Sequence, residues 1–517
     1  MNNSRMRKFL YVLLHLLVFI VLCSCVSLLW LRDNFGDIGI DEIIFTLSAG
    51  VKGTSDELLS SYYKFVIPIM AFFVVFYALL NYVLHKFDLK YFLHFRIKNK
   101  NTTIRLKMSQ LLVIVLIGSF SLGVYTANEK FGLFNYIKYS SQKSDFIEKN
   151  YVNPDGKVVF PDKKRNLIHI FMESGETTVM DKANGGLFDQ NYVPELTQIA
   201  KDNIAFSQSD LLEGALVTPG STWTTGGIFS QSNGIPIKRD IGNDALIKKH
   251  DFNHYFRTLK STADILRENG YSNYFMCGSD VSFGGKNSLL TSHGKYKIYD
   301  YNTAIKDGLI DKDYFVWWGM EDQKLFEYAK EKIATISKNP GPFNFTMLTV
   351  DTHHVDGYKC SLCENRFDKQ YANVYACSSK QISNFLNWIR EQPFYENTTV
   401  VITGDHCSMD PNFFEEVSAK STENFNDVQL NRKVYNAFIN SAIDTQYMKN
   451  RKFTTLDFFP TILASVGAEI KGERLGLGTN LFSGKETLSE KYGYKYLYDE
   501  LKKKSDFYEI NLMLMQK

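Results

Sequence analysis

The sequence predicts an α/β domain built on a mostly parallel sheet and preceded by about three membrane-spanning helices. Long apolar runs occupy much of residues 1–127, and beyond residue 164 short apolar runs alternate with stretches of helical spacing. Strands that alternate with helices are typical of a parallel sheet covered on both faces. We therefore expect a membrane region over 1–127, a juxtamembrane segment over 128–163 and a globular domain over 164–517. The juxtamembrane segment is either a helix on the bilayer surface followed by a turn at 153–156, or a plain spacer.

Three apolar runs have the length of a membrane-spanning helix. They cover residues 9–31, 65–84 and 108–127, and a helix needs about 20 apolar residues to cross the hydrocarbon core. The first run follows a basic start, but it is too long for the apolar part of a signal peptide and lacks a convincing cleavage site. The runs therefore predict three spans rather than a cleaved leader or buried core helices.

Charged residues in the loops predict the orientation of these spans. The loop 85–107 carries seven Lys and Arg residues against Asp88, whereas acidic residues dominate the loop after the first span. Basic loops stay in the cytoplasm, so the N-terminus and loop 85–107 are expected there. Three crossings then place the globular domain outside the cytoplasm, with the chain anchored in the inner or plasma membrane. The sequence leaves open whether the envelope has one membrane or two.

Composition excludes some classes of function. The net charge of +3 is close to neutral for 517 residues, so nothing indicates a nucleic-acid partner. Seven cysteines are too few for a disulfide framework. Cys360 and Cys363 have the spacing of half a zinc ribbon, but no second pair follows, and a local disulfide involving Cys377 is the favoured interpretation. Pairing stays open among the five cysteines after the last span, Cys277, Cys360, Cys363, Cys377 and Cys407.

Polar side chains follow several of the predicted strands. The apolar run 166–172 leads into Glu173, and the run 398–403 leads into Gly404, Asp405 and His406. Ligands of parallel sheets bind outside the carboxyl ends of the strands, and carboxylates with histidine suit Mn²⁺, Mg²⁺ or Zn²⁺. A Gly-Asp-His sequence alone is weak evidence, but Glu173 at a second strand end favours a metal site.

A segment rich in hydroxyl groups and glycine covers residues 217–237. It leads into a predicted helix start, where backbone N–H groups and the helix dipole favour an incoming phosphate. A hydroxyl held against a metal there can attack phosphorus. An ordinary N-cap explains the pattern equally well. The residues alone do not decide which hydroxyl is the nucleophile among Ser221, Thr222, Thr224 and Thr225.

Six motifs in order resemble the phosphoglycerol transferase family, which includes lipoteichoic acid synthases and glucan phosphoglycerol transferases. They are FMES (171–174), GSTWTTGGIFSQSNGIPI (220–237), GSDVSFGGKNSLLTSHG (278–294), LTVDTHHVDGY (348–358), GDHCSM (404–409) and LDFFPTIL–LGLGTNLFSG (456–484). The resemblance covers about residues 164 to 485, and the chain looks closest to the glucan type. It implies an alkaline phosphatase/sulfatase-like α/β fold.

The resemblance also implies roles for single residues. Thr224 corresponds to the nucleophile, and Glu173, Thr224, Asp405 and His406 to the ligands of one divalent metal, Mn²⁺ before Mg²⁺ or Zn²⁺. Substrate-binding positions correspond to His353, Trp223, Asp280 and Lys286, the last two by looser alignment. The number of predicted spans departs from the four or five of well-known relatives, so the N-terminal region is not carried over.

The implied reaction is a two-step transfer of glycerol phosphate from phosphatidylglycerol through a phosphodiester on Thr224. The acceptor is an envelope glycan or a teichoic-acid-type chain, and the sequence does not identify it, nor the oligomeric state. Alternatives are a phosphoethanolamine transferase, a sulfatase or phosphatase, and a catalytically silent glycan-binding protein. The Cys/Ser-x-Pro-x-Arg sequence of sulfatases does not occur at 217–237, and Met-Glu-Ser stands where phosphoethanolamine transferases carry a Gly-Glu-Thr-like sequence.

Overall fold

The structure is a computed structural model, and it describes residues 3–35, 39–49, 54, 56–86, 91–97, 100–106, 108–238, 256, 258–410, 412–415, 417 and 432–513. Contacts divide the chain into two compact units. The first is Met1–Ile40 with Thr54–Asn135, and the second is Asp41–Gly53 with Tyr136–Lys517.

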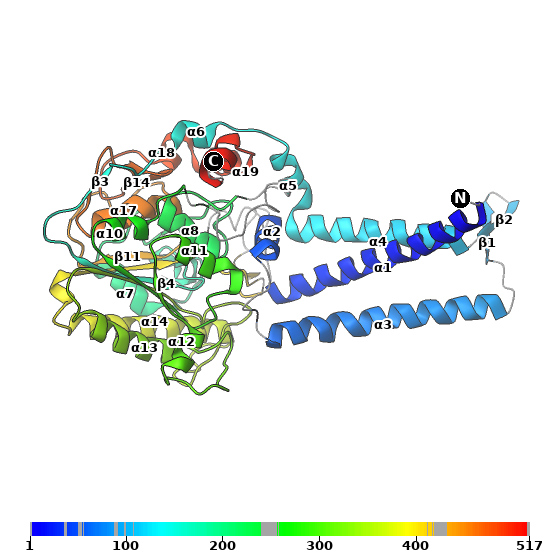
Figure 1. Cartoon of the computed structure of the whole chain (residues 1–517), viewed down its shortest axis with the longest axis horizontal. Coiled ribbons are helices and arrows are strands. Elements are labelled where there is room, and N and C mark those ends of the chain that lie inside the picture. The colour runs from blue at the N-terminus through cyan, green and yellow to red at the C-terminus, as the bar shows by residue number, and fades with distance from the viewer. Residues whose placement is uncertain are drawn as a thin grey trace. The chain divides into compact units, whose positions relative to one another are not determined.

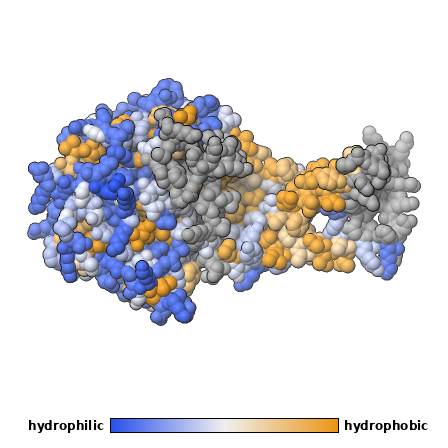
Figure 2. Space-filling view, viewed as in Figure 1, coloured by the Kyte–Doolittle hydropathy of each residue, from blue (hydrophilic) through white to orange (hydrophobic). Residues whose placement is uncertain are grey.

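Long helices make up most of the first unit. They are α1 (Asn3–Phe35), α3 (Asp56–Lys86) and α4 (Met108–Phe131). Each contains a stretch apolar enough to cross a membrane, of 24, 22 and 20 residues in that order. Figure 2 shows hydrophobic surface along them. The three predicted apolar helices are therefore present, and the chain is a membrane protein. Between α3 and α4 in sequence, β1 (Tyr91–Ile97) and β2 (Lys100–Leu106) form an antiparallel hairpin.

A six-stranded sheet forms the centre of the second unit. Its order is β11-β9-β4-β8-β6-β7, and all neighbours are parallel except β11, which is antiparallel to β9. The mostly parallel sheet is confirmed. The strands are β4 (Asn166–Met172), β6 (Ser272–Cys277), β7 (Lys297–Tyr299), β8 (Phe343–Leu348), β9 (Thr398–Gly404) and β11 (Asn436–Ile439).

Helices cover both faces of this sheet (Figure 1). On one face α7 (Pro194–Asp202), α13 (Asp322–Ile336) and α14 (Gln370–Arg390) share a core with Ile168 and Ile170 of β4. On the other, α10 (Thr262–Glu268) and α17 (Phe458–Ser465) share a core with Leu167 and Val401. Because both faces are covered, every residue of β4, β8 and β9 is buried.

Further helices and short strand pairs complete the second unit. The helices are α2 (Ile40–Ala49), α5 (Leu133–Ser140), α6 (Phe146–Asn150), α8 (Thr224–Asn233), α11 (Lys286–Ser292), α12 (Tyr301–Lys306), α18 (Leu488–Tyr492) and α19 (Tyr494–Lys502), of which α2 and α5 begin in the first unit. The antiparallel pairs are β3 (Val158–Val159) with β12 (Glu469–Ile470), β5 (Ala215–Leu216) with β10 (Lys433–Val434), and β13 (Arg474–Leu475) with β14 (Gly478–Thr479).

The segment before the sheet packs on the C-terminal helices. The Tyr139 hydroxyl donates to Asp499 at 3.1 Å, and the Phe146 ring contacts the Tyr492 ring edge-on at 5.3 Å between centroids. The predicted turn near Pro154 is present, because the Lys157 N–H donates to the Pro154 carbonyl. Residues 136–163 are therefore a packed part of the second unit rather than a plain spacer.

Candidate metal centre and active site

Two neighbouring strands bring the predicted acidic residues to one edge of the sheet. Met172 of β4 is paired with Gly404 of β9, so Glu173 and Asp405, the next residues, leave the sheet side by side. The two turns touch here, since a Cβ on Gly404 would lie 1.7 Å from the Gly175 carbonyl oxygen. Only glycine allows so close an approach of two backbones.

Glu173, Asp405 and His406 form a buried cluster whose ligand atoms all lie within 4.8 Å of one another. His406 Nε2 is 3.2 Å from Glu173 Oε1 and 3.5 Å from Asp405 Oδ2. His406 Nδ1 lies 2.8 Å from the Cys407 carbonyl oxygen, to which it donates, so Nε2 is the ring nitrogen that faces the carboxylates. Side chains far apart in sequence thus converge on one point.

The Asp405 carboxylate divides its two oxygens between the backbone and the cluster. Oδ1 accepts from the N–H groups of Ser174 at 2.9 Å and His406 at 2.8 Å. Oδ2 is buried with no hydrogen-bond partner among the described residues. A buried, unpartnered carboxylate oxygen is costly unless a cation neutralises it. The mixed oxygen and nitrogen donors with this open oxygen fit a divalent metal ion.

Thr224 opens helix α8 and faces the same cluster. Its Oγ1 donates to Glu173 Oε2 at 3.2 Å and lies 3.4 Å from His406 Nε2. Trp223 precedes it as the N-cap residue, with an extended backbone. The neighbouring Thr225 hydroxyl points elsewhere and donates to the Gly284 carbonyl at 2.8 Å. Among the hydroxyl groups of residues 217–237 whose contacts the structure describes, the Thr224 hydroxyl is the one that contacts the cluster.

The charges of Glu173, Asp405 and His406 shift one another's pKa values. Burial raises the pKa of Glu173, but the hydrogen bond and charge of His406 outweigh it, and the pKa falls below its usual range. Burial lowers the pKa of His406, yet the charges of Asp405 and Glu173 outweigh that and raise it to about 10. Burial and the Glu173 charge raise the pKa of Asp405. Without an ion, the cluster holds a proton that a bound cation would replace.

The predicted substrate-binding residues lie around this cluster in different ways. His353 follows β8, its Nδ1 donates to the His354 carbonyl at 2.7 Å, and its ring packs on Trp318 at 4.8 Å between centroids. Burial lowers the pKa of His353, and the Glu173 charge opposes that effect. The Trp223 side chain is buried beside the nucleophile segment.

Lys286 and Asp280, the two positions with the looser alignment, form hydrogen bonds to residues near them in sequence. Lys286 begins α11 and donates to the Phe283 carbonyl at 2.9 Å. Burial lowers its pKa, while the charges of Glu173 and Asp405 raise it, which places the ammonium within electrostatic reach of the cluster. Asp280 accepts from the Ser282 N–H at 2.8 Å and shapes its own loop.

A helix that sequence reasoning did not connect with the site also lies here. Helix α2 comes from the loop after the first apolar helix, and its Phe45, 2% exposed, packs on the Trp223 ring at 5.7 Å between centroids. The Gly220 N–H donates to Asp41. Burial raises the pKa of Glu42 to about 8, and the His406 charge opposes this. The acidic pair Asp41 and Glu42 entered the sequence analysis only as loop charges.

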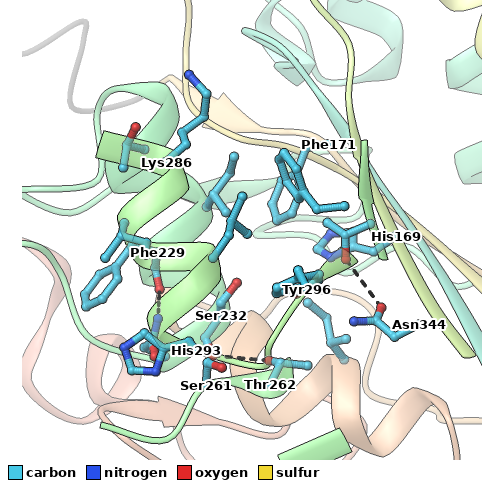
Figure 3. Close-up of a pocket in the computed structure, with 18 of the residues that line it drawn as sticks. His169, Phe171, Phe229, Ser232, Ser261, Thr262, Lys286, His293, Tyr296 and Asn344 are labelled. Atoms are coloured by element: carbon cyan, nitrogen blue, oxygen red, sulfur yellow. Dashed lines mark hydrogen bonds between the residues drawn. The ribbon is translucent and has the colours of Figure 1, made fainter. Parts of the chain in front are cut away.

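A buried pocket lies behind the nucleophile helix and is separate from the cluster. Figure 3 shows side chains that line it, among them His169 and Phe171 of β4, Phe229 of α8 and Lys286. Its volume is about 50 Å³, and none of the candidate metal ligands lines it. Burial lowers the pKa of His169 to about 3. The pocket lies between the helices and the sheet, and it is not the opening to the candidate centre.

Most of the second unit matches a known protein family. A family model described as Sulfatase matches residues 165–468, more than half of the 517-residue chain. Phosphoglycerol transferase I of Escherichia coli (strain K12) is 29% identical over 360 residues, which are 68% of this chain and 43% of that protein. The protein of the same name from Shigella flexneri gives the same values. The chain thus spans less than half the length of these curated relatives.

Solved structures show a more distant likeness. An alkaline phosphatase superfamily protein from Vibrio parahaemolyticus is 20% identical, with a TM-score of 0.49 over 69% of this chain and 79% of that one. The lipoteichoic acid synthase LtaP from Listeria monocytogenes is 17% identical, with a TM-score of 0.48 over 65% of this chain and 80% of that one. A likeness of this size does not bear on the substrate.

Proposed function

Because the chain belongs to the sulfatase family, we propose that it is a membrane-bound phosphoglycerol transferase with Thr224 as its nucleophile. The family match agrees with the α/β fold expected from the motifs. The observation that carries the proposal is the position of the Thr224 hydroxyl, 3.2 Å from Glu173 and 3.4 Å from His406. The 29% identity to phosphoglycerol transferase I supports the transferred group.

The chemistry of the first step follows from these side chains. The Thr224 oxygen attacks the phosphorus of phosphatidylglycerol, the bond from phosphorus to the diacylglycerol oxygen breaks, and Glu173 Oε2 is placed to accept the hydroxyl proton. Glu173, Asp405, His406 and Thr224 would hold one divalent ion, Mn²⁺ by the family resemblance. When bound, such an ion lowers the pKa of the hydroxyl and offsets charge on the phosphoryl oxygens.

His353 is proposed to handle protons at the leaving and entering oxygens. With Nδ1–H held by the His354 carbonyl, Nε2 is the nitrogen that exchanges a proton with substrate. A bound phosphodiester anion would raise the pKa that burial lowers, so the protonated ring can donate to the diacylglycerol oxygen. The neutral ring then accepts the proton of an acceptor hydroxyl, which attacks phosphorus. The bond from phosphorus to the Thr224 oxygen breaks, and that oxygen takes back the proton held by Glu173.

The membrane helices suit a lipid donor, whose headgroup stays at the bilayer surface. We propose that the globular domain lies outside the cytoplasm, because the basic residues gather in the segment 85–107 and at the N-terminus. The glycerol phosphate group is proposed to pass to an envelope glycan or to a polyglycerolphosphate chain, both of which present hydroxyl groups.

Intact mass spectrometry of the full chain in detergent tests the nucleophile. After incubation with phosphatidylglycerol and Mn²⁺ but no acceptor, we expect the mass of one glycerophosphoryl group on Thr224. Thr224→Val should lose the adduct and turnover, whereas Thr225→Val, which removes the neighbouring hydroxyl with the same change of shape, should keep the adduct. An adduct that persists in Thr224→Val would refute the proposal.

A donor assay separates the alternatives. Vesicles with headgroup-labelled phosphatidylglycerol or phosphatidylethanolamine are offered in parallel, and label transfer is measured. Preference for phosphatidylethanolamine would identify a phosphoethanolamine transferase. Release of free glycerol phosphate at the same rate with and without acceptor would identify a hydrolase.

A further inference from the structure

Three cysteines form a second cluster, in a part of the fold that the reaction does not use. Cys360 and Cys363 lie in the segment after β8, and Cys377 lies in α14. Cys360 Sγ is 3.6 Å from Cys363 Sγ and 3.7 Å from Cys377 Sγ. All three sulfurs lie within 4.8 Å of one another. Sequence spacing suggested a local disulfide here, but the structure has all three thiols free.

The arrangement of the sulfurs is that of ligands around a common point. A disulfide joins two sulfurs and leaves the third aside, whereas Cys360 stands at nearly the same distance from both of the others. In a tetrahedral zinc site with Zn–S bonds of about 2.3 Å, neighbouring sulfurs lie about 3.8 Å apart. The two measured separations therefore match the edges of a thiolate–metal tetrahedron.

A side-chain hydrogen-bond donor lies beside two of the three sulfurs. The Gln381 side-chain amide donates toward Cys360 Sγ at 3.7 Å and toward Cys377 Sγ at 3.5 Å. Donors of this kind hold the ligands of a metal site in place and stabilise their negative charge. A disulfide has no charge for them to stabilise.

We propose that Cys360, Cys363 and Cys377 bind one thiophilic d¹⁰ cation, Zn²⁺. Binding forms three sulfur–metal bonds and releases the three thiol protons to solvent. Among the residues that the structure describes, no fourth His, Cys, Asp or Glu joins the group, so the protein supplies three of the four ligands of a tetrahedral site. Sulfur selects a soft ion here, while the carboxylates of the catalytic cluster suit a harder one.

The bound ion would fasten the segment that carries His353 to helix α14. That segment is already tied to α14 by the Tyr371 hydroxyl, which donates to the Thr352 carbonyl at 2.7 Å. The Tyr358 N–H donates to the Asp351 carbonyl at 2.7 Å. A metal joining Cys360 and Cys363 to Cys377 closes the far end of the same segment. The role is structural, and the proposal does not depend on the proposed transferase activity.

Metal analysis of the full chain in detergent tests the site. The protein is loaded with one equivalent of Zn²⁺ under reducing conditions and desalted, and zinc is measured by mass spectrometry of the element. We expect about one zinc per chain, lost in Cys377→Ser and kept in Cys277→Ser, a buried cysteine outside the cluster. Mn²⁺ binding at the catalytic cluster, followed by electron paramagnetic resonance, should be the same in all three proteins.

A second readout needs no variant. Co²⁺ in place of Zn²⁺ should give the intense sulfur-to-cobalt charge-transfer absorption of a thiolate site, which oxygen ligands do not produce. Two findings would overturn the proposal. One is a desalted, reduced protein that retains neither zinc nor that absorption. The other is a native protein in which two of the three cysteines resist alkylation until a reductant is added.

Discussion

The Asp405 side chain shows how one residue joins the fold to the proposed chemistry. One oxygen accepts two backbone N–H groups and holds the turn after β9, while the other faces Glu173 and His406 without a partner among the described residues. Asp405→Asn keeps an oxygen for the backbone but puts an uncharged amide on the metal side. We expect the fold to persist and Mn²⁺ affinity to fall by more than about 100-fold, since losing an outer-shell partner already costs 10–100-fold.

Isothermal titration with Mn²⁺ measures this loss, and the melting temperature in detergent reports on the fold. Asp280→Asn is the matched control, because that carboxylate accepts from the Ser282 N–H within its own loop. Unchanged Mn²⁺ affinity in Asp405→Asn would remove Asp405 from the metal site.

The buried carboxylate of Asp264 makes the stability of the fold depend on pH. Its Oδ2 accepts from Ser261 Oγ at 2.8 Å and contacts His293 Nδ1 at 2.8 Å, and its Oδ1 accepts from the Gly294 N–H. Burial raises the pKa of Asp264, but the hydrogen bond and charge of His293 outweigh it and lower the pKa. A carboxylate with a lowered pKa stabilises the fold above its unfolded pKa of about 3.9, and this contribution is lost as the pH falls through the lower folded pKa.

Asp264→Asn should therefore cost about 1–3 kcal/mol at pH 7, and the cost should shrink below pH of about 4. Melting curves of both proteins across this range measure it. A gap that stays constant down to the lowest pH would show that the charge of Asp264 does not contribute.

At the scale of elements, helix α2, in the loop after the first apolar helix, packs against the residue that precedes the proposed nucleophile. Phe45 is buried against Trp223, the residue before Thr224. Replacing a core Phe by Ala costs about 3–5 kcal/mol, which is enough to loosen a helix of 10 residues. Phe45→Ala should raise amide hydrogen exchange over 41–49 and 220–226 and lower turnover.

Hydrogen-exchange mass spectrometry with a donor assay tests this. Leu211→Ala, at a side chain that is 43% exposed, is the control and should change neither segment. Protection of 220–226 that is unaffected by Phe45→Ala would show that α2 does not support the nucleophile turn.

At the scale of the whole molecule, the topology can be tested directly. The proposed topology, in which all three apolar helices cross the membrane, would put the N-terminus and the globular domain on opposite sides of it. Alkaline phosphatase fused after residue 513 should be active, and the same enzyme inserted in the hairpin of β1 and β2 should be inactive. A cytoplasmic reporter at the same two positions should give the reverse pattern. An active phosphatase at both positions would contradict the proposed orientation.

Several features were predictable because they depend on short stretches of chain. The three long helices follow from continuous apolar runs, and the central strands β4, β8 and β9 from short apolar runs ended by polar residues. The side chain of Asp457 accepts from the Thr454 N–H in a local capping box just before α17. In each case neighbouring residues carry the signal, so no knowledge of distant contacts is required.

By itself, the sequence determined the apolar helices, the parallel sheet and the order of motifs, because these depend on local composition and spacing. Only the tertiary structure decided which hydroxyl faces Glu173 and His406, since the residues alone left Ser221, Thr222, Thr224 and Thr225 open. It also decided that α2 packs beside Trp223, and that the sulfurs of three cysteines lie within 4.8 Å of one another. Such contacts join residues far apart along the chain, and their distances are set by how the sheet and its helices pack.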